Sequence, residues 1–234
     1  MKFNREFANQ IIDDLINCVD TASKEIMQIY NSDNFETSDK ADGSPLTLAD
    51  KASNQIITEG LKKITPDIAV ISEETFEDTI LKALPNLYWL VDPLDGTREF
   101  INKNDEFTVN IALIEDRKPV FGIVAAPVFE KCWHGSIFDN YHSDKSIPDV
   151  LRIVMSKSHK SDNDKSFLNY LNEKGVNYKI IEKGSSLKLC AIADNEADIY
   201  PRFGPTSEWD IAAAHSVLSA YGGCVLKVDD FSDL

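Results

Sequence analysis

The chain has 234 residues, 43% of them hydrophobic, so it can bury a sizeable core as one compact unit or as two closely packed lobes. The formal net charge of -15 argues against a nucleic-acid partner, because a nucleic-acid groove needs a basic stripe. The early residues carry mixed charges, and the longest apolar stretch, PVFGIVAAPVF, is far shorter than the roughly 20 residues that a bilayer needs, so the sequence predicts neither a secretory signal nor a transmembrane segment.

The first part of the chain is predicted to be rich in sheet. Apolar residues at helical spacing predict a long amphipathic helix over residues 7–29, and a second helix is expected over residues 47–63. The polar stretch NSDNFETSDKADGSP between them is expected to be a mobile loop. Short apolar runs bounded by turn residues predict strands over residues 68–71, 87–91, 107–114, 120–128 and 131–138.

Beyond a polar link at residues 139–149 the pattern alternates between strands and helices. Strands are expected over residues 151–154, 178–181, 197–200 and 224–228, and helices over residues 164–173, 186–193 and 208–221. The predicted fold is therefore an α/β (α+β) layered sandwich with two closely packed lobes, 1–145 and 146–234.

Four cysteines, Cys18, Cys132, Cys190 and Cys224, are scattered without C-x-x-C spacing. Such usage is typical of reduced, mostly structural thiols, so we expect a cytoplasmic protein, and a peripheral association with the inner membrane is compatible with that location. An anionic substrate would have to be attracted by something other than the net charge. A divalent metal held by some of the 39 acidic residues is the economical candidate, since hard cations take carboxylate oxygens.

The stretch WLVDPLDGTREF, residues 89–100, holds two aspartates three positions apart. The preceding apolar run predicts a buried strand with Asp92 at its end, where Pro93 should stop the strand because proline cannot donate to a sheet. The chain should then turn through Asp95-Gly96-Thr97, so that two carboxylates leave a rigid strand side by side. The alternative is an Asx-type turn in which both side chains cap local amides.

Three further stretches place an acidic residue at the end of an apolar run. They are Thr47-Leu48-Ala49-Asp50, Ser72-Glu73-Glu74 and Trp209-Asp210. The first matches a helix capping box, as does Ser207 with Asp210, and Glu73 can equally be a solvated side chain. Strand ends and helix starts are also where α/β proteins collect site residues, so convergence of these carboxylates is a hypothesis.

Two polar stretches suit a phosphorylated ligand. Gly184-Ser185-Ser186 precedes the helix that carries Lys188, and such a helix start offers free amides, hydroxyls and the positive end of the helix dipole to an anion. Ser156-Lys157-Ser158-His159 is similarly polar after a strand. Taken alone, the first is as readily a helix cap and the second a surface loop.

Taken in order, these stretches resemble one enzyme family, the lithium-sensitive, magnesium-dependent phosphomonoesterases that include inositol monophosphatase, fructose-1,6-bisphosphatase and the 3'-phosphoadenosine phosphatases. The D-P-L-D-G-T signature is the family's central mark. The branch that the chain resembles most is the CysQ-type 3'(2'),5'-bisphosphate nucleotidases. The stretches that carry the resemblance, between about residue 40 and residue 223, are DGSPLTLAD, ISEE, WLVDPLDGTREF, FTVNIALI, GIVAAPV, SKSH, GSSLK and YPRFGPTSEWDIAAAH.

The resemblance implies the inositol monophosphatase-like fold and two or three Mg²⁺ ions. The implied reaction removes the 3'-phosphate of adenosine 3',5'-bisphosphate to give AMP, which clears a by-product of sulfate assimilation. Asp50 and Thr97 would orient or deprotonate the attacking water through a hydrogen bond between their side chains, with no covalent enzyme intermediate. The implied metal ligands are Glu73, Asp92, the main-chain carbonyl of Leu94, Asp95 and Asp210.

The resemblance also implies a substrate site shared between the lobes, with most metal ligands in the first lobe and the nucleotide-binding residues in the second. The amides of Gly96 and Thr97 would hold the phosphate that is cleaved, beside Glu73, Leu94, Asp95 and Asp210. The positions that match the nucleotide-binding residues of the branch are His159, Ser185, Lys188 and Arg202. A lysine and an arginine suit a second phosphate.

Some features depart from the family's pattern. The segment between Trp133 and Arg152 is short of a glycine-bearing hairpin, and the chain ends at Leu234, where relatives continue through a further strand. Either departure would leave a sheet edge open and lower stability and activity. Ala214 replaces a glycine of many relatives, with no clear consequence.

Three other functions stay open. Haloacid-dehalogenase phosphatases also carry an Asp-rich loop at a strand end, but their two aspartates are two positions apart, not three. Within the family, inositol phosphate is the alternative substrate. A non-catalytic magnesium- or nucleotide-binding relative is the alternative outside enzymes. The protein can form a homodimer in any of these cases.

Overall fold

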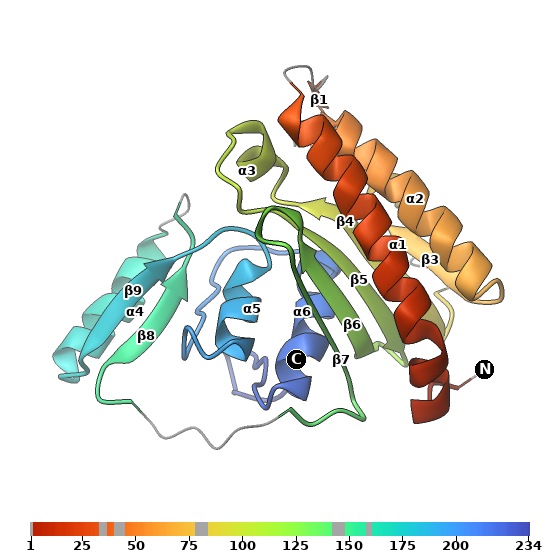
Figure 1. The fold of residues 1–234 in the computed structure, drawn as a ribbon. Coiled ribbons are helices and arrows are strands. Elements are labelled where there is room, and N and C mark those ends of the chain that lie inside the picture. Colours follow the sequence, from red (N-terminus) through yellow and green to blue (C-terminus); the bar gives the residue numbers. More distant parts are fainter. Residues whose placement is uncertain (1, 33–36, 40–44, 78–83, 142–147, 158–160) are drawn as a thin grey trace.

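The structure, a computed structural model, describes residues 2–32, 37–39, 45–77, 84–141, 148–157 and 161–234. Helices and sheets are stacked in layers, with a five-stranded sheet between two pairs of helices and a small two-stranded unit beyond one pair (Figure 1). The predicted α/β layered fold is confirmed. The division into lobes at residue 145 stays a prediction.

The central sheet has the strand order β3-β4-β5-β6-β7. β3 is parallel to β4, and the other neighbours are antiparallel. A tight turn joins β5 to β6, in which Asp116 and Arg117 have φ angles of 48° and 70°, as a primed hairpin turn requires. The strands are β3 (Ala69–Ser72), β4 (Leu87–Asp95), β5 (Thr108–Glu115), β6 (Lys118–Ala126) and β7 (Lys131–Ser136).

Two long helices, α1 (Arg5–Asn31) and α2 (Leu48–Ile64), cover one face of the sheet (Figure 1). Alternate residues of β4, such as Trp89 and Val91, join their core. The Trp89 indole nitrogen donates to the buried Thr65 hydroxyl at 2.8 Å, so the polar atom of this large side chain is satisfied.

The opposite face of the sheet is covered by α5 (Leu187–Ala193) and α6 (Glu208–Ala220). The backbone of α6 lies so close to β6 that a Cβ on Gly122 would be only 2.1 Å from the Ala213 carbonyl oxygen. Because helices bury both faces, β4 reads as a continuous apolar run rather than an alternating one. The residues that follow the apolar run of β4 therefore lie at an edge of the sheet between the two helix layers.

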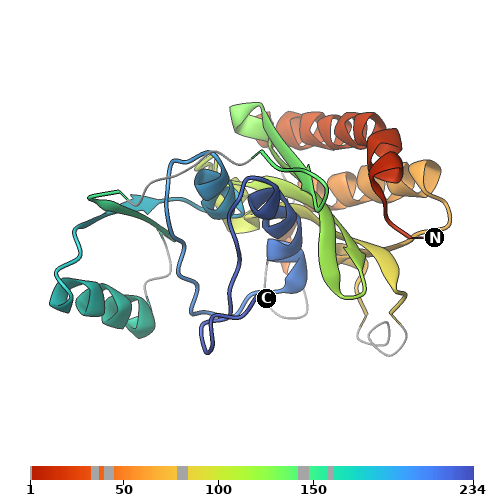
Figure 2. The same ribbon diagram turned by 90° about the horizontal axis from the view of Figure 1, so that it is seen from below.

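A smaller unit lies on the far side of α5 and α6 in both ribbon views (Figures 1 and 2). It consists of the parallel strands β8 (Leu151–Met155) and β9 (Tyr178–Glu182) with α4 (Asp162–Glu173) packed on them. The expected strand over residues 197–200 contributes only one bridge, between Ile153 and Ile199. The expected strand over residues 224–228 likewise contributes one bridge, between Leu226 and Asp233.

The polar stretch after α1 is not wholly a loop, contrary to the prediction. β1 (Thr37–Asp39) pairs antiparallel with β2 (Pro45–Thr47), which leads directly into α2. The remaining described elements are short: η1 (Glu73–Thr75), α3 (Thr97–Ile101) and η3 (Pro127–Phe129).

Among the described helices none is both long and apolar enough to cross a bilayer. The cysteines are free thiols, and burial raises the pKa of Cys18 and of Cys190. A buried thiol with a raised pKa is a poor nucleophile, which fits the structural role predicted for these residues.

Candidate active site

The parallel pairing of β3 with β4 brings two acidic residues together. Ser72 of β3 lies opposite Val91 of β4 in the sheet. Glu73 and Asp92, which directly follow these two residues, therefore lie side by side at the same edge. Asp92 is buried, with 1% of its surface exposed, and is hydrogen bonded to Glu73. The hypothesis that the carboxylates at these two strand ends converge is therefore confirmed for Glu73 and Asp92.

β4 does not end at Pro93, contrary to the prediction. The register shifts between Asp92 and Asp95, and β4 resumes at Asp95, opposite Thr108 of β5. A proline is tolerated there because a bulge needs no ladder hydrogen bond at that position. The Pro93 carbonyl instead accepts from the buried Ser53 hydroxyl at 2.8 Å.

The Asx-type turn, weighed as the alternative for this stretch, is present at Asp92 but not at Asp95. The Leu94 amide donates to Asp92 Oδ1 at 3.1 Å, which closes the turn and fixes the direction of the Leu94 segment. The Asp95 carboxylate instead reaches residues far along the chain. Asp92 therefore combines a local partner, the Leu94 amide, with a distant one, Glu73.

Asp95 is held by the turn that precedes α5. Its Oδ2 accepts from the Ser185 hydroxyl at 2.7 Å, from the Ser186 amide at 2.7 Å and from the Ser186 hydroxyl at 2.9 Å. Ser186 is also 2.9 Å from the Asp210 main-chain carbonyl, so its single hydroxyl proton is shared between the two acceptors. Ser186 is the N-cap residue of α5, as the helix-cap alternative for this stretch had it, but its side chain caps no helical amide.

Asp210 lies at the start of α6 and forms the predicted capping box with Ser207. Its Oδ2 accepts from the Ser207 amide at 3.0 Å and from the Thr206 hydroxyl at 2.9 Å. The neighbouring Trp209 ring packs edge to face on Phe76, 5.2 Å between centroids, which docks the start of α6 against the segment that carries Glu73. Asp210 thus caps α6 and also lies near the other carboxylates.

The four acidic side chains share one electrostatic environment. Burial raises the pKa of Asp92 well above its ordinary value, and the charges of Asp95, Glu73 and Asp210 raise it further. The pKa of Asp210 is also raised, first by burial and then by the Asp95 charge. Carboxylates whose negative charges raise one another's pKa are stabilised in the ionised form by a cation placed among them.

In the described part of the chain, no three or more acidic, histidine or cysteine side chains are arranged to hold a metal ion in this structure. Asp95 and Asp210 both accept hydrogen bonds at Oδ2, Asp95 from the turn before α5 and Asp210 from the start of its own helix. The chemistry of the set nevertheless fits a hard divalent cation, because the donors are carboxylate oxygens and the buried Asp92 carries an uncompensated charge when ionised.

Asp50 and Thr97 meet as predicted. Thr97 Oγ1 donates to Asp50 Oδ1 at 3.1 Å. The other oxygen of the buried Asp50 accepts from the Thr47 amide and hydroxyl at 2.7 and 2.5 Å, which completes the capping box of α2. Asp50 therefore both caps a helix and contacts Thr97. Gly96, with φ 94° and ψ 41°, takes the left-handed conformation that places Thr97 at the start of α3.

A cavity of about 140 Å³ opens beside these acids. Its lining includes residues from four segments: Asp95, Gly96, Lys188, Tyr200, Arg202 and Asp210. The cavity therefore joins two of the predicted metal ligands, Asp95 and Asp210, to three of the predicted nucleotide-binding residues, Ser185, Lys188 and Arg202. His159 lies outside the described residues.

Lys188 is buried at the back of this cavity, with 6% of its surface exposed. Its Nζ donates to the Ser185 carbonyl at 2.6 Å and lies over the Tyr200 ring, 5.5 Å from the centroid. Burial lowers the pKa of Lys188, while the Asp95 carboxylate opposes that change. Arg202 is exposed and is steadied by the Pro205 carbonyl at 2.6 Å.

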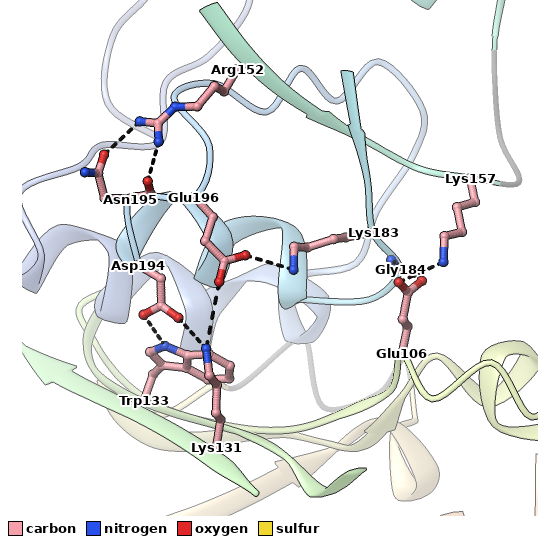
Figure 3. Close-up of polar contacts among 10 residues, drawn as sticks. All are labelled: Glu106, Lys131, Trp133, Arg152, Lys157, Lys183, Gly184, Asp194, Asn195 and Glu196. Carbon is pink, nitrogen blue, oxygen red and sulfur yellow. Dashed lines mark hydrogen bonds and ion pairs between the residues drawn. The ribbon is translucent and has the colours of Figure 1, made fainter. Parts of the chain in front are cut away.

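The amides of the turn before α5 are not free, contrary to the prediction. The Gly184 amide donates to Glu106 Oε2 at 3.0 Å, and the Ser186 amide is taken by Asp95. Glu106 Oε1 also accepts from Lys157 at 2.9 Å, so one carboxylate ties the turn to the polar stretch after β8 (Figure 3). Glu106 is only 13% exposed at its side chain.

The far end of α5 is tied to β7. Asp194, the C-cap residue, accepts from the Trp133 indole at 2.7 Å and from Lys131 at 3.0 Å, while Glu196 pairs with Lys183 at 3.0 Å (Figure 3). These contacts fix the helix that carries Lys188. None of them was predicted.

Several residues of the site escaped the sequence analysis. Thr108 is an ordinary polar residue in sequence, and Tyr200 is an ordinary aromatic residue at the end of a predicted strand. Ser186 was noted for its helix start but not for its hydrogen bonds to Asp95. Glu106 carried a weak signal, because it is an acidic residue directly before the strand FTVNIALI. Their roles depend on pairing between distant segments, which no local pattern encodes.

Comparison with known proteins agrees with this geometry. A sequence model described as the inositol monophosphatase family matches residues 8–231. The chain is 42% identical over 213 residues to 3'(2'),5'-bisphosphate nucleotidase CysQ of Salmonella typhimurium, which covers 87% of this chain and 85% of that protein.

Solved structures show the same fold. The crystal structure of CysQ from Bacteroides thetaiotaomicron, described as a bacterial member of the inositol monophosphatase family, superposes with a TM-score of 0.75 at 33% identity, covering 88% of this chain and 84% of that chain. An IMPase from Thermotoga maritima superposes with a TM-score of 0.73 at 19% identity, covering 91% of this chain and 84% of that chain. The second likeness concerns the fold alone.

Proposed function

Because the chain belongs to the inositol monophosphatase family, we propose that it is a magnesium-dependent phosphomonoesterase that removes the 3'-phosphate of adenosine 3',5'-bisphosphate and releases AMP. The observation that carries the proposal is that Asp95 and Asp210 line one cavity together with Lys188 and Arg202. The charges of these two aspartates and of Glu73 also act on the buried Asp92. The name of the Salmonella relative, a 3'(2'),5'-bisphosphate nucleotidase, supports the choice of substrate.

Members of this family are generally magnesium-dependent. Here two or three Mg²⁺ ions would be held by the oxygens of Glu73, Asp92, Asp95 and Asp210 and by the Leu94 carbonyl. Bound Mg²⁺ supplies charge neutralisation for the phosphate and lowers the pKa of a coordinated water. The Asx turn at Asp92 supports the role of Leu94, because it fixes the direction of that backbone segment.

Thr97 and Asp50 handle the proton of the attacking water in this mechanism. Since Thr97 donates to Asp50, its hydroxyl oxygen can accept a hydrogen bond from water at the same time. As the water attacks phosphorus and the bond between phosphorus and the 3'-oxygen breaks, the water proton passes to Thr97 Oγ1 and the threonine proton passes to Asp50. The departing 3'-oxygen takes a proton from solvent water to become the 3'-hydroxyl of AMP. The capping box holds Asp50 in place for this transfer.

The remaining residues position the substrate. Gly96 lines the cavity beside Asp95, and its amide and that of Thr97 would bind the phosphate that is cleaved. Lys188 and Arg202 would take the second phosphate, and His159, Ser185 and the metal-bound acids complete the predicted contacts. Charge-assisted hydrogen bonds of this kind are about twice as strong as neutral ones.

Inositol phosphate is the second candidate substrate. The fold likeness to the Thermotoga IMPase favours a phosphomonoesterase scaffold without separating the two substrates. A buried lysine beside a tyrosine ring and an exposed arginine favours the nucleotide, since a bisphosphate offers a second anion to these cations.

The test is phosphate release by the purified full chain from adenosine 3',5'-bisphosphate, inositol 1-phosphate and fructose 1,6-bisphosphate, each with and without Mg²⁺. We expect the nucleotide to have the highest kcat/KM and Asp95→Asn to abolish turnover. Preference for inositol phosphate would keep the site and refute the substrate. Nucleotide binding by calorimetry without phosphate release would identify a non-catalytic relative.

We further propose a cytoplasmic location, which the four free thiols, two buried and two exposed, support. Homodimer formation stays a prediction, which sedimentation of the purified chain will test.

A further inference from the structure

A chain of hydrogen-bonded side chains runs from the core of β5 to the carboxylate of Asp95. Asn110 Nδ2 donates to Thr108 Oγ1 at 3.2 Å, the Thr108 and Ser185 hydroxyls lie 2.6 Å apart, and Ser185 donates to Asp95 Oδ2 at 2.7 Å. We propose that Thr108 is a positioning residue that orients Asp95 for Mg²⁺ through Ser185. The inference rests on the proposed function only in taking Asp95 as a metal ligand.

We call the chain from Asn110 through Thr108 and Ser185 to Asp95 the relay. The direction of each of its hydrogen bonds follows from the ionised carboxylate of Asp95 at its end. An ionised carboxylate only accepts, so Ser185 must give its single proton to Asp95. The Ser185 oxygen must then accept from Thr108, whose proton is thereby used. Thr108 can accept in turn only from an amide donor, which is Asn110 Nδ2. Each link therefore depends on the one behind it.

The relay begins in the buried centre of the sheet. Thr108 and Asn110 are fully buried on the central strand β5, and Thr108 lies directly opposite Asp95 in the β4–β5 pairing. Ser185 belongs to a turn and has a φ of 51°, a left-handed conformation that is uncommon for serine. The hydrogen bond from Thr108, which is fixed in the sheet, thus restrains the Ser185 side chain, which belongs to a turn.

The relay fixes the orientation of the Asp95 carboxylate. Within the described residues, the hydrogen bonds to the Asp95 side chain all go to Oδ2, from Ser185 and Ser186. Three donors on one oxygen prevent the carboxylate from rotating and leave Oδ1 for a cation. Residues that orient metal ligands in this way govern metal affinity although they never touch the metal.

The relay also changes the expectation for Ser185. The family resemblance made this residue a substrate contact, but its hydroxyl proton is already directed to Asp95. Ser185 then affects the reaction through the metal ligand as well as through any contact with the nucleotide.

The test is Mg²⁺ binding by isothermal titration calorimetry on the purified full chain, with no nucleotide present. Thr108→Val keeps the shape of the side chain but removes the hydroxyl, and we expect it to weaken Mg²⁺ affinity by about 10-fold. Thr108→Ser keeps the hydroxyl and is expected to stay within about threefold of the natural sequence. Equal or tighter Mg²⁺ binding by Thr108→Val overturns the proposal.

A double-mutant cycle separates positioning from a general loss of structure. If Thr108 acts only through Ser185, the variant with both Thr108→Val and Ser185→Ala binds Mg²⁺ as Ser185→Ala alone does. Additive losses overturn the relay. Should Thr108→Val fail to fold, Ser185→Ala must still weaken Mg²⁺ binding, and an unchanged affinity overturns the proposal. Because the readout is metal affinity, a failure to hydrolyse the nucleotide bears on the proposed function alone.

Discussion

Thr97 Oγ1 lies 3.1 Å from Asp50 Oδ1 and donates a hydrogen bond to it. Thr97→Val removes both the donor and the oxygen that would accept the water proton, so we predict a loss of about 100-fold or more in kcat. Thr97→Ser keeps the hydroxyl and should retain activity within about tenfold. Steady-state phosphate release at saturating Mg²⁺ measures both.

Asp50 makes a poorer probe than Thr97, because its side chain also caps α2. Replacing it would lower stability as well as catalysis. A Thr97→Val protein that keeps its natural kcat would remove this pair from the chemistry, whatever its Mg²⁺ affinity.

Asp92 makes the metal-free protein sensitive to pH. Its folded-state pKa lies well above the ordinary value of 3.8, so the folded chain binds more protons than the unfolded chain as the pH rises above 3.8. Stability must therefore fall with rising pH until Asp92 is ionised in the folded state, and it must be highest on the acid side of that window.

Asp92→Asn should remove this dependence. With EDTA present, we expect the variant to be more stable than the natural sequence at pH 8 and to lose that advantage as the pH approaches 3.8. Urea unfolding across this range measures the difference. Added Mg²⁺ should stabilise the natural sequence more than the variant, and an identical response of the two proteins to Mg²⁺ would argue against Asp92 as a ligand.

Lys188 is predicted to act in substrate binding rather than in the chemical step. Lys188→Met should raise the KM for the nucleotide by about 10-fold or more, with a smaller change in kcat, because a buried cation at a phosphate is lost. Lys157→Met is the matched control, since this lysine is 45% exposed and pairs with Glu106. Its effect should stay within about threefold.

The pH profile gives Lys188 a second readout. Burial lowers its pKa from 10.5, so the cation is lost at a lower pH than for a free lysine. The KM of the natural sequence should rise on the alkaline side, while that of Lys188→Met should stay flat there. A parallel rise in both proteins would assign the effect to another group.

Much of this site could be predicted because its residues follow strong local signals. An apolar run, a proline and Asp-Gly-Thr locate Asp92 and Asp95, and the capping-box pattern locates Asp50 and Asp210. The competing local interpretations were correct as well: Asp50 and Asp210 do cap helices, and Asp92 does form an Asx turn. Local pattern could not decide between capping and a role in the site, because Asp50 caps α2 and also contacts Thr97, and Asp210 caps α6 and also interacts with the Asp95 charge.

The rest of the site depends on contacts between residues that are far apart in the sequence. Thr108, Ser186 and Glu106 acquire roles only when the turn before α5 packs on the sheet. Pro93 misled the strand prediction because a bulge, which local sequence does not reveal, accommodates it. The expected strands near residues 197–200 and 224–228 reduce to single bridges, since their apolar residues find few strand partners.

Gly122 tests the packing of α6 on the sheet. A Cβ at this position would be 2.1 Å from the Ala213 carbonyl oxygen, so backbone must move to admit it. We predict that Gly122→Ala lowers the free energy of unfolding by about 3 kcal/mol or more. Gly204→Ala is the control, because no atom lies within 4 Å of its added Cβ. Equal stability of the two variants in urea would show that α6 packs less closely.

The central claim is tested most directly by identifying the product formed from adenosine 3',5'-bisphosphate in the presence of Mg²⁺. Phosphorus NMR of the reaction should show inorganic phosphate and 5'-AMP appearing together, with both signals absent for Asp95→Asn and for the natural sequence in EDTA. Release of 3'-AMP, or no phosphate from a folded, Mg²⁺-saturated protein, would contradict the account.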